Sequence, residues 1–99
     1  MKTIVVRYQA KPDRAEENQR LIEAVFAEME ERKPQGFTYR VFRLDDAVSF
    51  IHVVIEDDIE QRDSLQDVPA FQAFVADIAD RCDVAPAAPA ATIVGDYRG

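Results

Sequence analysis

The stretch Phe50-Ile51-His52-Val53-Val54-Ile55 decides how the rest of this chain has to fold. All of its residues except the histidine are aromatic or β-branched, which is typical of a β-strand. Successive side chains of a strand point to opposite faces. One face therefore carries Phe50, His52 and Val54, and the other carries Ile51, Val53 and Ile55. A strand with one face in water would alternate apolar and polar residues, so we expect this strand to be covered on both faces.

Three further strands and two helices are predicted around this strand. The segments Thr3–Gln9 and Phe37–Leu44 are rich in β-branched and aromatic residues, and Thr92–Tyr97 is a shorter run of the same kind. The short polar segment 45–49 favours an antiparallel hairpin between the two central runs. The helices are predicted to run from Asp13 to Lys33 and from the segment 67–69 to about residue 81.

The two helices are predicted from apolar residues that recur at helical spacing. Asp13 followed by Glu16 has the spacing of a capping box, and Pro34 and Gly36 are expected to end the first helix. The apolar stripe of the first helix is Leu21, Ile22, Val25, Phe26 and Met29, and that of the second is Phe71, Phe74, Val75, Ile78 and Cys82. The segment 85–90, which holds two prolines, is predicted to be a connector.

The element order β-α-β-β-α-β predicts a ferredoxin-like α+β fold, a four-stranded antiparallel sheet with two helices on one face. Two helices cover only one face of such a sheet. If each strand face removes about 200 Å² of apolar area from water, the gain is about 5 kcal/mol at roughly 25 cal/mol per Å². We therefore expect a homodimer in which two open sheet faces pack together. The aliphatic face of the strand 50–55 is expected to meet the helices, and the face of His52 is expected to line a cavity between the sheets.

The composition excludes several classes of protein. The length of 99 residues predicts a single domain over residues 1–99. The chain has 12 Lys and Arg against 19 Asp and Glu, a net charge of -7, so we expect it to bind neither nucleic acid nor anionic membranes. No apolar run is long enough to cross a membrane, and no signal-peptide pattern opens the chain. A lone cysteine fits a reducing compartment, so a cytoplasmic location is expected. One His and one Cys cannot form a His/Cys metal cage, so neither a metal nor a cofactor is expected.

At this point the chain resembles the dimeric α+β barrel superfamily, most closely its antibiotic-biosynthesis-monooxygenase-like branch. The matching segments are Lys11-Pro12 after the first strand, Gly36-Phe37-Thr38-Tyr39 at the start of the hairpin, Phe50–Glu56, and Val68-Pro69-Ala70-Phe71-Gln72-Ala73-Phe74. The resemblance implies a barrel across a two-fold axis with an internal cavity in each subunit. Families of this type include cofactor-independent quinone-forming monooxygenases, haem-degrading enzymes, lactone isomerases and members without an assigned role.

Two departures from that branch bear on activity. Its members usually carry a tryptophan just after the third strand, whereas this chain has no tryptophan and has Glu56-Asp57 in that region. They also often carry a histidine before the second helix, where this chain has Leu65, which can neither ligate haem iron nor move a proton. A haem-degrading activity is therefore disfavoured.

Five residues are the candidates for a site. His52 is predicted to act as a general base or as a donor to a substrate oxygen, with a hydrogen-bonded strand histidine as the structural alternative. Tyr39 is predicted to hydrogen-bond a ligand carbonyl or phenolate, or else to be a core tyrosine with a solvated hydroxyl. Arg7 is a candidate for contacting a ligand anion, or it lies at a rim. Phe50 and Val54, on the face of His52, are predicted to contact the ligand.

Other polar residues are given structural roles. The acidic run from Glu56 to Glu60 lacks the glycine of a calcium loop and is predicted to be solvated. Cys82 lies on an apolar stripe and is predicted to be a small core residue. Arg40 and Arg43 lie on opposite faces of their strand, so only one of them can point inward.

Two functions remain open from the sequence. The first is a homodimer whose cavity binds an apolar or aromatic metabolite and acts on it as a cofactor-independent monooxygenase or isomerase. In that case the protein need only deprotonate a phenol-like substrate and stabilise the anion, because the substrate itself passes electrons to oxygen. The second is a non-catalytic small-molecule-binding or accessory dimerisation module.

Overall fold

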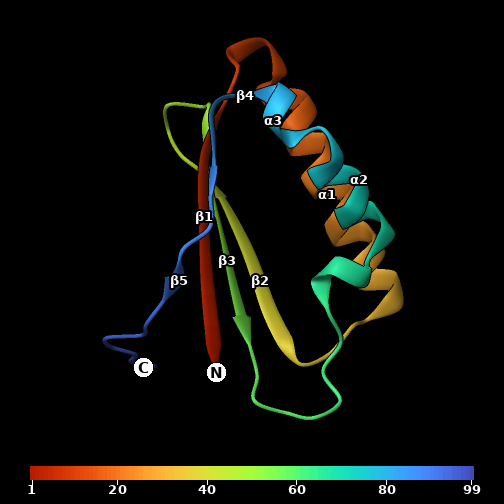
Figure 1. The fold of residues 1–99 in the computed structure, drawn as a ribbon, viewed down its shortest axis with the longest axis vertical. Coiled ribbons are helices and arrows are strands. Elements are labelled where there is room, and N and C mark those ends of the chain that lie inside the picture. The colour runs from red at the N-terminus through yellow and green to blue at the C-terminus, as the bar shows by residue number, and fades with distance from the viewer.

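An antiparallel sheet with a layer of helices on one of its faces makes up the protein, whose computed structural model describes residues 1–99 (Figure 1). The strands are β1 (Lys2–Ala10), β2 (Phe37–Arg43), β3 (Ser49–Glu56), β4 (Cys82–Ala87) and β5 (Ala90–Ala91). The helices are α1 (Ala15–Arg32), α2 (Pro69–Ala76) and α3 (Ile78–Arg81), with 3-10 turns at Pro12–Arg14 and Leu65–Asp67. The predicted ferredoxin-like α+β architecture is confirmed.

The sheet has the strand order β2-β3-β1-β4, which places β3 between β1 and β2. All of these pairs are antiparallel. His52 lies opposite Val6 of β1 and opposite Val41 of β2. Its diagonal neighbours are Tyr8, which pairs with Phe50, and Tyr39, which pairs with Val54. The register therefore places two tyrosines on the same face of the sheet as the histidine.

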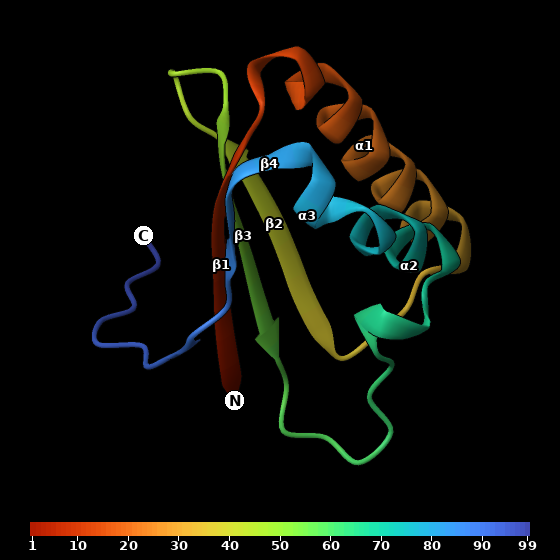
Figure 2. The same cartoon turned by 45° about the horizontal axis from the view of Figure 1, so that its top comes forward.

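The faces of β3 are the reverse of those predicted. Phe50, His52 and Val54 are 1%, 3% and 9% exposed and belong to the face that meets the helices. Their aliphatic neighbours at positions 51, 53 and 55 are only partly buried, and the open face on which they lie is not covered by helices (Figure 2). The prediction failed because hydrophobicity alone ranks the aliphatic face higher, whereas the ring-bearing face buries more volume against the helices.

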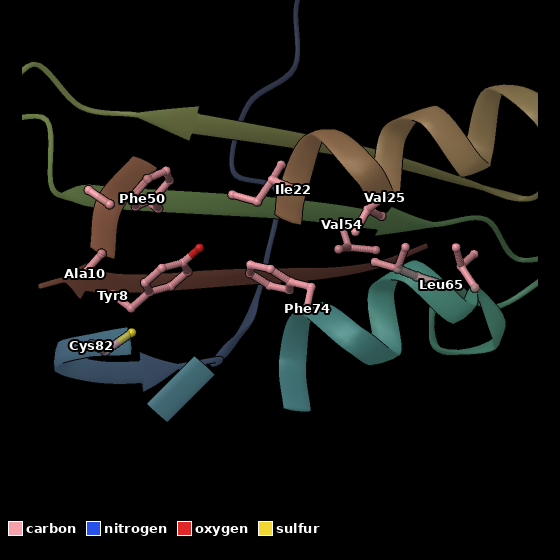
Figure 3. Close-up of a cluster of buried hydrophobic side chains, with 11 residues drawn as sticks. Tyr8, Ala10, Ile22, Val25, Phe50, Val54, Leu65, Phe74 and Cys82 are labelled. Carbon is pink, nitrogen blue, oxygen red and sulfur yellow. The ribbon is translucent and has the colours of Figure 1, made fainter. Parts of the chain in front are cut away.

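The core lies between this face of the sheet and the helices. Figure 3 shows its side chains between α1 and α2 on one side and β1 and β3 on the other. Tyr8, Val25, Phe50 and Phe74 are each no more than 2% exposed. Tyr8 stacks on Phe50 with ring centroids 5.5 Å apart. Between the layers, Phe26 of α1 stacks on Tyr39 with ring centroids 5.1 Å apart, and Phe74 of α2 stacks on His52 at 5.4 Å. Aromatic contacts therefore help to fix the helices to the sheet and add to the burial of apolar area.

The start of α1 differs from the predicted capping box. Asp13 lies in the 3-10 turn, and Arg14, at the N-cap of α1, makes no capping side-chain hydrogen bond. Arg14 instead forms an ion pair with Glu17 at 2.9 Å. The predicted end is confirmed, because Lys33 adopts the left-handed conformation (φ 52°) and donates its backbone N–H to Met29.

The C-terminal third also departs from the prediction. The second helix is interrupted at Asp77, Cys82 begins β4 instead of ending a helix, and the predicted connector contributes to β4 and β5. β4 is an edge strand, which explains why it tolerates Pro86. The predicted strand Thr92–Tyr97 does not form, and the chain after β5 runs on the side of the sheet away from the helices (Figures 1 and 2). None of the helices combines the length and the apolar character needed to cross a membrane.

Candidate functional site

The candidate site centres on His52, in the middle of β3. The hydroxyl oxygen of Tyr8 lies 2.7 Å from His52 Nε2, and that of Tyr39 lies 2.7 Å from His52 Nδ1. Each tyrosine comes from a strand that flanks β3, in the diagonal position that the sheet register provides. Both ring nitrogens of the only histidine in the chain are therefore bound to phenol hydroxyls.

Two further side chains extend these contacts toward the helices. Asn18 of α1 donates from Nδ2 to the Tyr8 hydroxyl at 2.8 Å. Arg81, at the end of α3, donates from Nε to Asn18 Oδ1 at 3.1 Å and from Nη2 to the carbonyl of Phe74 at 2.5 Å. We call this series Arg81–Asn18–Tyr8–His52–Tyr39 the polar chain.

Arg81 is a buried cation at the far end of the polar chain. Its side chain is 1% exposed, and no ion pair of the protein includes it. Its guanidinium lies over the ring of Phe74, 5.2 Å from the centroid, and donates to the neutral acceptors already described. A buried charge without a carboxylate partner is unusual. The two hydrogen bonds and the ring of Phe74 hold the guanidinium of Arg81 in one position.

The other end of the polar chain opens on a cavity of about 310 Å³ between the sheet and the helices. Of its 15 lining residues, 11 are hydrophobic. Tyr8, Tyr39 and His52 supply polar atoms beside this apolar wall, and Glu56 and Gln66 also line the cavity. The cavity is at the lower end of the usual size of small-molecule sites, roughly 300–1,000 Å³. Such an arrangement suits a small apolar molecule that carries one hydrogen-bonding oxygen.

Burial sets the protonation states at the site. It lowers the pKa of His52 to about 4, so the imidazole is neutral at neutral pH. It raises the pKa of both Tyr8 and Tyr39, so both hydroxyls stay protonated. Tyr8, Tyr39 and His52 are therefore neutral hydrogen-bonding groups, and an imidazolium would form there only at a large cost.

The structure brings together three of the five candidate residues. His52, Tyr39 and Val54 all line the cavity. Phe50 does not line it and instead packs against Tyr8. Arg7 is exposed on the opposite face of the sheet from His52, so it does not reach this cavity. The cavity lies on the helix side of the sheet, within this single chain, which corrects the expectation that His52 faces a space between two sheets.

The remaining arginines lie apart from the cavity, whereas Glu56 lines it and forms an ion pair with Arg62 at 3.8 Å. Arg43 is the inward arginine of β2 and donates from Nη1 to Gln19 at 2.7 Å, whereas Arg40 is exposed. The acidic run after β3 is exposed beyond Glu56, and Cys82 is buried in the core as predicted. No group of three or more His, Cys, Asp or Glu side chains is placed to hold a metal ion.

Three residues of the site were missed from the sequence: Tyr8, Asn18 and Arg81. Each of them carried a signal. Tyr8 lies on the same face of the first strand as Ile4 and Val6, which is its more apolar face. Asn18 precedes Ile22 by four residues, and Arg81 follows Phe74 by seven, so both lie on apolar helix stripes. A polar residue on such a stripe is expected to be buried with a polar partner.

Comparisons with known proteins support the fold. No family model matches the chain, and no curated protein matches it. Among solved structures, Rv0793 from Mycobacterium tuberculosis aligns with a TM-score of 0.73 and 13% identity over 98% of both chains. A structure described as an antibiotic biosynthesis monooxygenase aligns with a TM-score of 0.69 and 13% identity, over 96% of this chain and 100% of the other. A Nitrosomonas europaea protein provisionally given the same name has a TM-score of 0.73 and 9% identity, over 94% and 89%.

The chain shares the fold of these proteins. The resemblance to the antibiotic-biosynthesis-monooxygenase-like fold is therefore confirmed over nearly the whole length of the chain. At identities of 9–13% the alignments establish architecture alone, so activity has to be argued from the site of this chain.

Proposed function

We propose that this protein binds a small apolar or aromatic metabolite in the cavity beside His52 and acts on it as a cofactor-independent monooxygenase. The observation that carries the proposal is the placement of Tyr39, His52 and Tyr8 at the wall of a mainly hydrophobic cavity. The fold that the chain shares with proteins named antibiotic biosynthesis monooxygenases supports the same reaction class.

The reaction needs a substrate with an acidic position, such as a ring CH₂ beside a carbonyl or its phenol tautomer. The carboxylate of Glu56, which lines the same cavity, can accept the proton. Its loss gives an electron-rich anion, whose oxygen the hydroxyl of Tyr39 can stabilise by donating a hydrogen bond. The anion then transfers electrons to O₂. One oxygen atom ends as a carbonyl on the ring carbon, and the other leaves as water with the two hydrogens of the former CH₂. The protein supplies positioning, a dry cavity and hydrogen bonds.

We also propose that the open sheet face pairs with a second copy. Arg7, Phe42 and the side chains at positions 51, 53 and 55 lie on this face, and Phe42 is 46% exposed. Exposed apolar area of this kind favours association. Because the cavity is on the other face, each subunit would keep its own cavity whether or not the pair forms.

A non-catalytic binding role is the second candidate. The observation in its favour is that both nitrogens of His52 already have partners, so His52 has no free nitrogen with which to take a proton from a substrate. The two candidates predict the same binding and differ in oxygen consumption.

The test combines binding and turnover. We expect a naphthalene-sized ketone to bind, and a tricyclic ketone with a ring CH₂ to consume oxygen and yield a quinone. Val54→Phe, which fills the cavity, should abolish both, whereas Val53→Phe on the opposite face of the same strand should retain both; circular dichroism checks that both variants fold. Binding without oxygen uptake would support the second candidate. Binding that Val54→Phe leaves unchanged would place the ligand elsewhere and refute both.

A further inference from the structure

The direction of every hydrogen bond in the polar chain follows from its Arg81 end. A guanidinium has N–H donors and no acceptor. Asn18 therefore turns its oxygen toward Arg81 Nε, 3.1 Å away, and its NH₂ group toward the hydroxyl of Tyr8, 2.8 Å away. Arg81 thus fixes which end of the Asn18 amide faces the sheet.

The next bond is fixed by the burial of Tyr8. Its hydroxyl accepts from Asn18, and the only other partner of that hydroxyl is His52 Nε2. Because Tyr8 is 1% exposed, a hydroxyl proton without an acceptor would be costly. Tyr8 therefore donates to Nε2, and Nε2 carries no proton. A neutral imidazole then has its proton on Nδ1, which donates to the hydroxyl of Tyr39.

The last group of the polar chain is a donor without a protein acceptor. The oxygen of Tyr39 accepts from His52, and no side chain or backbone group of the protein accepts its hydroxyl proton. Tyr39 is half-buried and lines the cavity. The proton of Tyr39 is thus available to whatever occupies the cavity.

We infer that Arg81, acting through Asn18, Tyr8 and His52, makes Tyr39 a fixed hydrogen-bond donor, so that the cavity selects apolar ligands with a carbonyl or deprotonated oxygen over ligands that can only donate. The inference rests on the proposed function for the existence of a ligand, and it adds the ligand class and two positioning residues. Arg81 and Asn18 do not line the cavity. They act by setting the protonated nitrogen of His52.

The chain offers a direct test because it contains one histidine. In the ligand-free protein labelled with ¹⁵N-histidine, we expect the NMR spectrum at neutral pH to show the proton on Nδ1. A proton on Nε2 in the wild-type protein would overturn the inference, whether or not any ligand binds.

Asn18→Asp should reverse the polar chain. A carboxylate at this position accepts from Arg81 and also from Tyr8, so the oxygen of Tyr8 must then accept from His52 Nε2–H. His52 Nδ1 would then accept from Tyr39, and the proton should move from Nδ1 to Nε2. Gln19→Glu is the matched control, since it adds the same charge one residue along α1, where Arg43 already donates to the side-chain oxygen. A tautomer that stays on Nδ1 in Asn18→Asp would contradict the inference.

Ligand preference gives the second readout. The probes are a naphthyl methyl ketone, which only accepts, and a benzindole of similar size, whose N–H only donates. We expect the wild-type protein to prefer the ketone about tenfold, as one satisfied hydrogen bond predicts, and Asn18→Asp to prefer the benzindole. Tyr39→Phe should bind both equally. If neither probe binds, the proposed function and the ligand selectivity both fail, whereas the tautomer result still decides the direction of the polar chain.

Discussion

Asn18 of α1 and His52 of β3 are joined through one oxygen atom, the hydroxyl of Tyr8, which lies 2.8 Å from Asn18 Nδ2 and 2.7 Å from His52 Nε2. This contact connects the helix layer to the middle of the sheet inside the hydrophobic core. Because all three side chains are at most 3% exposed, none of their polar atoms can turn to water instead.

The first prediction concerns Tyr8→Phe. The substitution keeps the ring that stacks on Phe50 and removes the hydroxyl, leaving Asn18 Nδ2 and His52 Nε2 without their partner. We expect a loss of about 1–3 kcal/mol in the free energy of unfolding, measured by urea denaturation. Tyr39→Phe is the matched comparison and should cost less, because the hydroxyl of Tyr39 has one hydrogen-bond partner, His52, and that of Tyr8 has two. Equal losses for the two variants would mean that the hydroxyls of Tyr8 and Tyr39 contribute equally to the free energy of unfolding, which would contradict the prediction.

The second prediction is a pH dependence of stability that comes from His52. Its pKa is about 4 in the folded protein and about 6.5 in the unfolded chain, so between these values the unfolded chain binds one more proton. The stabilisation is complete above about pH 6.5 and is lost progressively as the pH falls toward 4, by roughly 3 kcal/mol. Carboxylates titrate in part of this range, so the measurement is the difference between wild type and His52→Gln in urea denaturation from pH 4 to pH 7. A difference that does not change with pH would contradict the assignment.

The overall fold could be predicted because its signals are local. The apolar stripe around Ile22 and Val25 and the β-branched run 50–55 each define an element without reference to distant residues. β4 was missed because it gains its strand structure by pairing with the edge of β1, whereas its own sequence, with Pro86 and several alanines, is a poor strand former. The local sequence of β4 therefore did not predict a strand.

The site was predicted only in part for the same reason. The sequence indicated His52 and Val54 by residue type and strand parity, and Tyr39 by residue type alone, because the turn length left its face open. The face of β3 that meets the helices depends on how β3 pairs with the strands of Tyr8 and Tyr39. These residues are 44 and 13 positions away from His52 in the sequence. The contact of Arg81 with Asn18 spans 63 residues, so each appeared in the sequence as an isolated polar residue on an apolar stripe.

The third prediction concerns the end of α1. Lys33 holds a left-handed conformation at φ 52°, which costs a residue with a Cβ more than glycine. Lys33→Gly should raise the free energy of unfolding by about 0.5–1 kcal/mol. Arg32→Gly, one residue earlier and inside the helix, should lower it by a similar amount. Thermal unfolding followed by circular dichroism measures both, and a destabilised Lys33→Gly would show that the side chain contributes more than its conformation costs.

The last prediction separates association from the site. Val53 lies on the open face of β3 and Val54 on the cavity face, one residue apart. If the open faces of two copies pack together, Val53→Asp places a charge in the centre of that contact and should convert a dimer into an 11.2 kDa monomer in sedimentation experiments. The ¹⁵N spectrum of His52 should be unchanged, since the polar chain and the cavity lie wholly within one subunit on the helix side. A wild-type protein that sediments as a monomer at micromolar concentration would refute the pairing. A change in the ¹⁵N spectrum of His52 when the dimer dissociates would show that the second copy is needed to hold His52 and its hydrogen bonds in place.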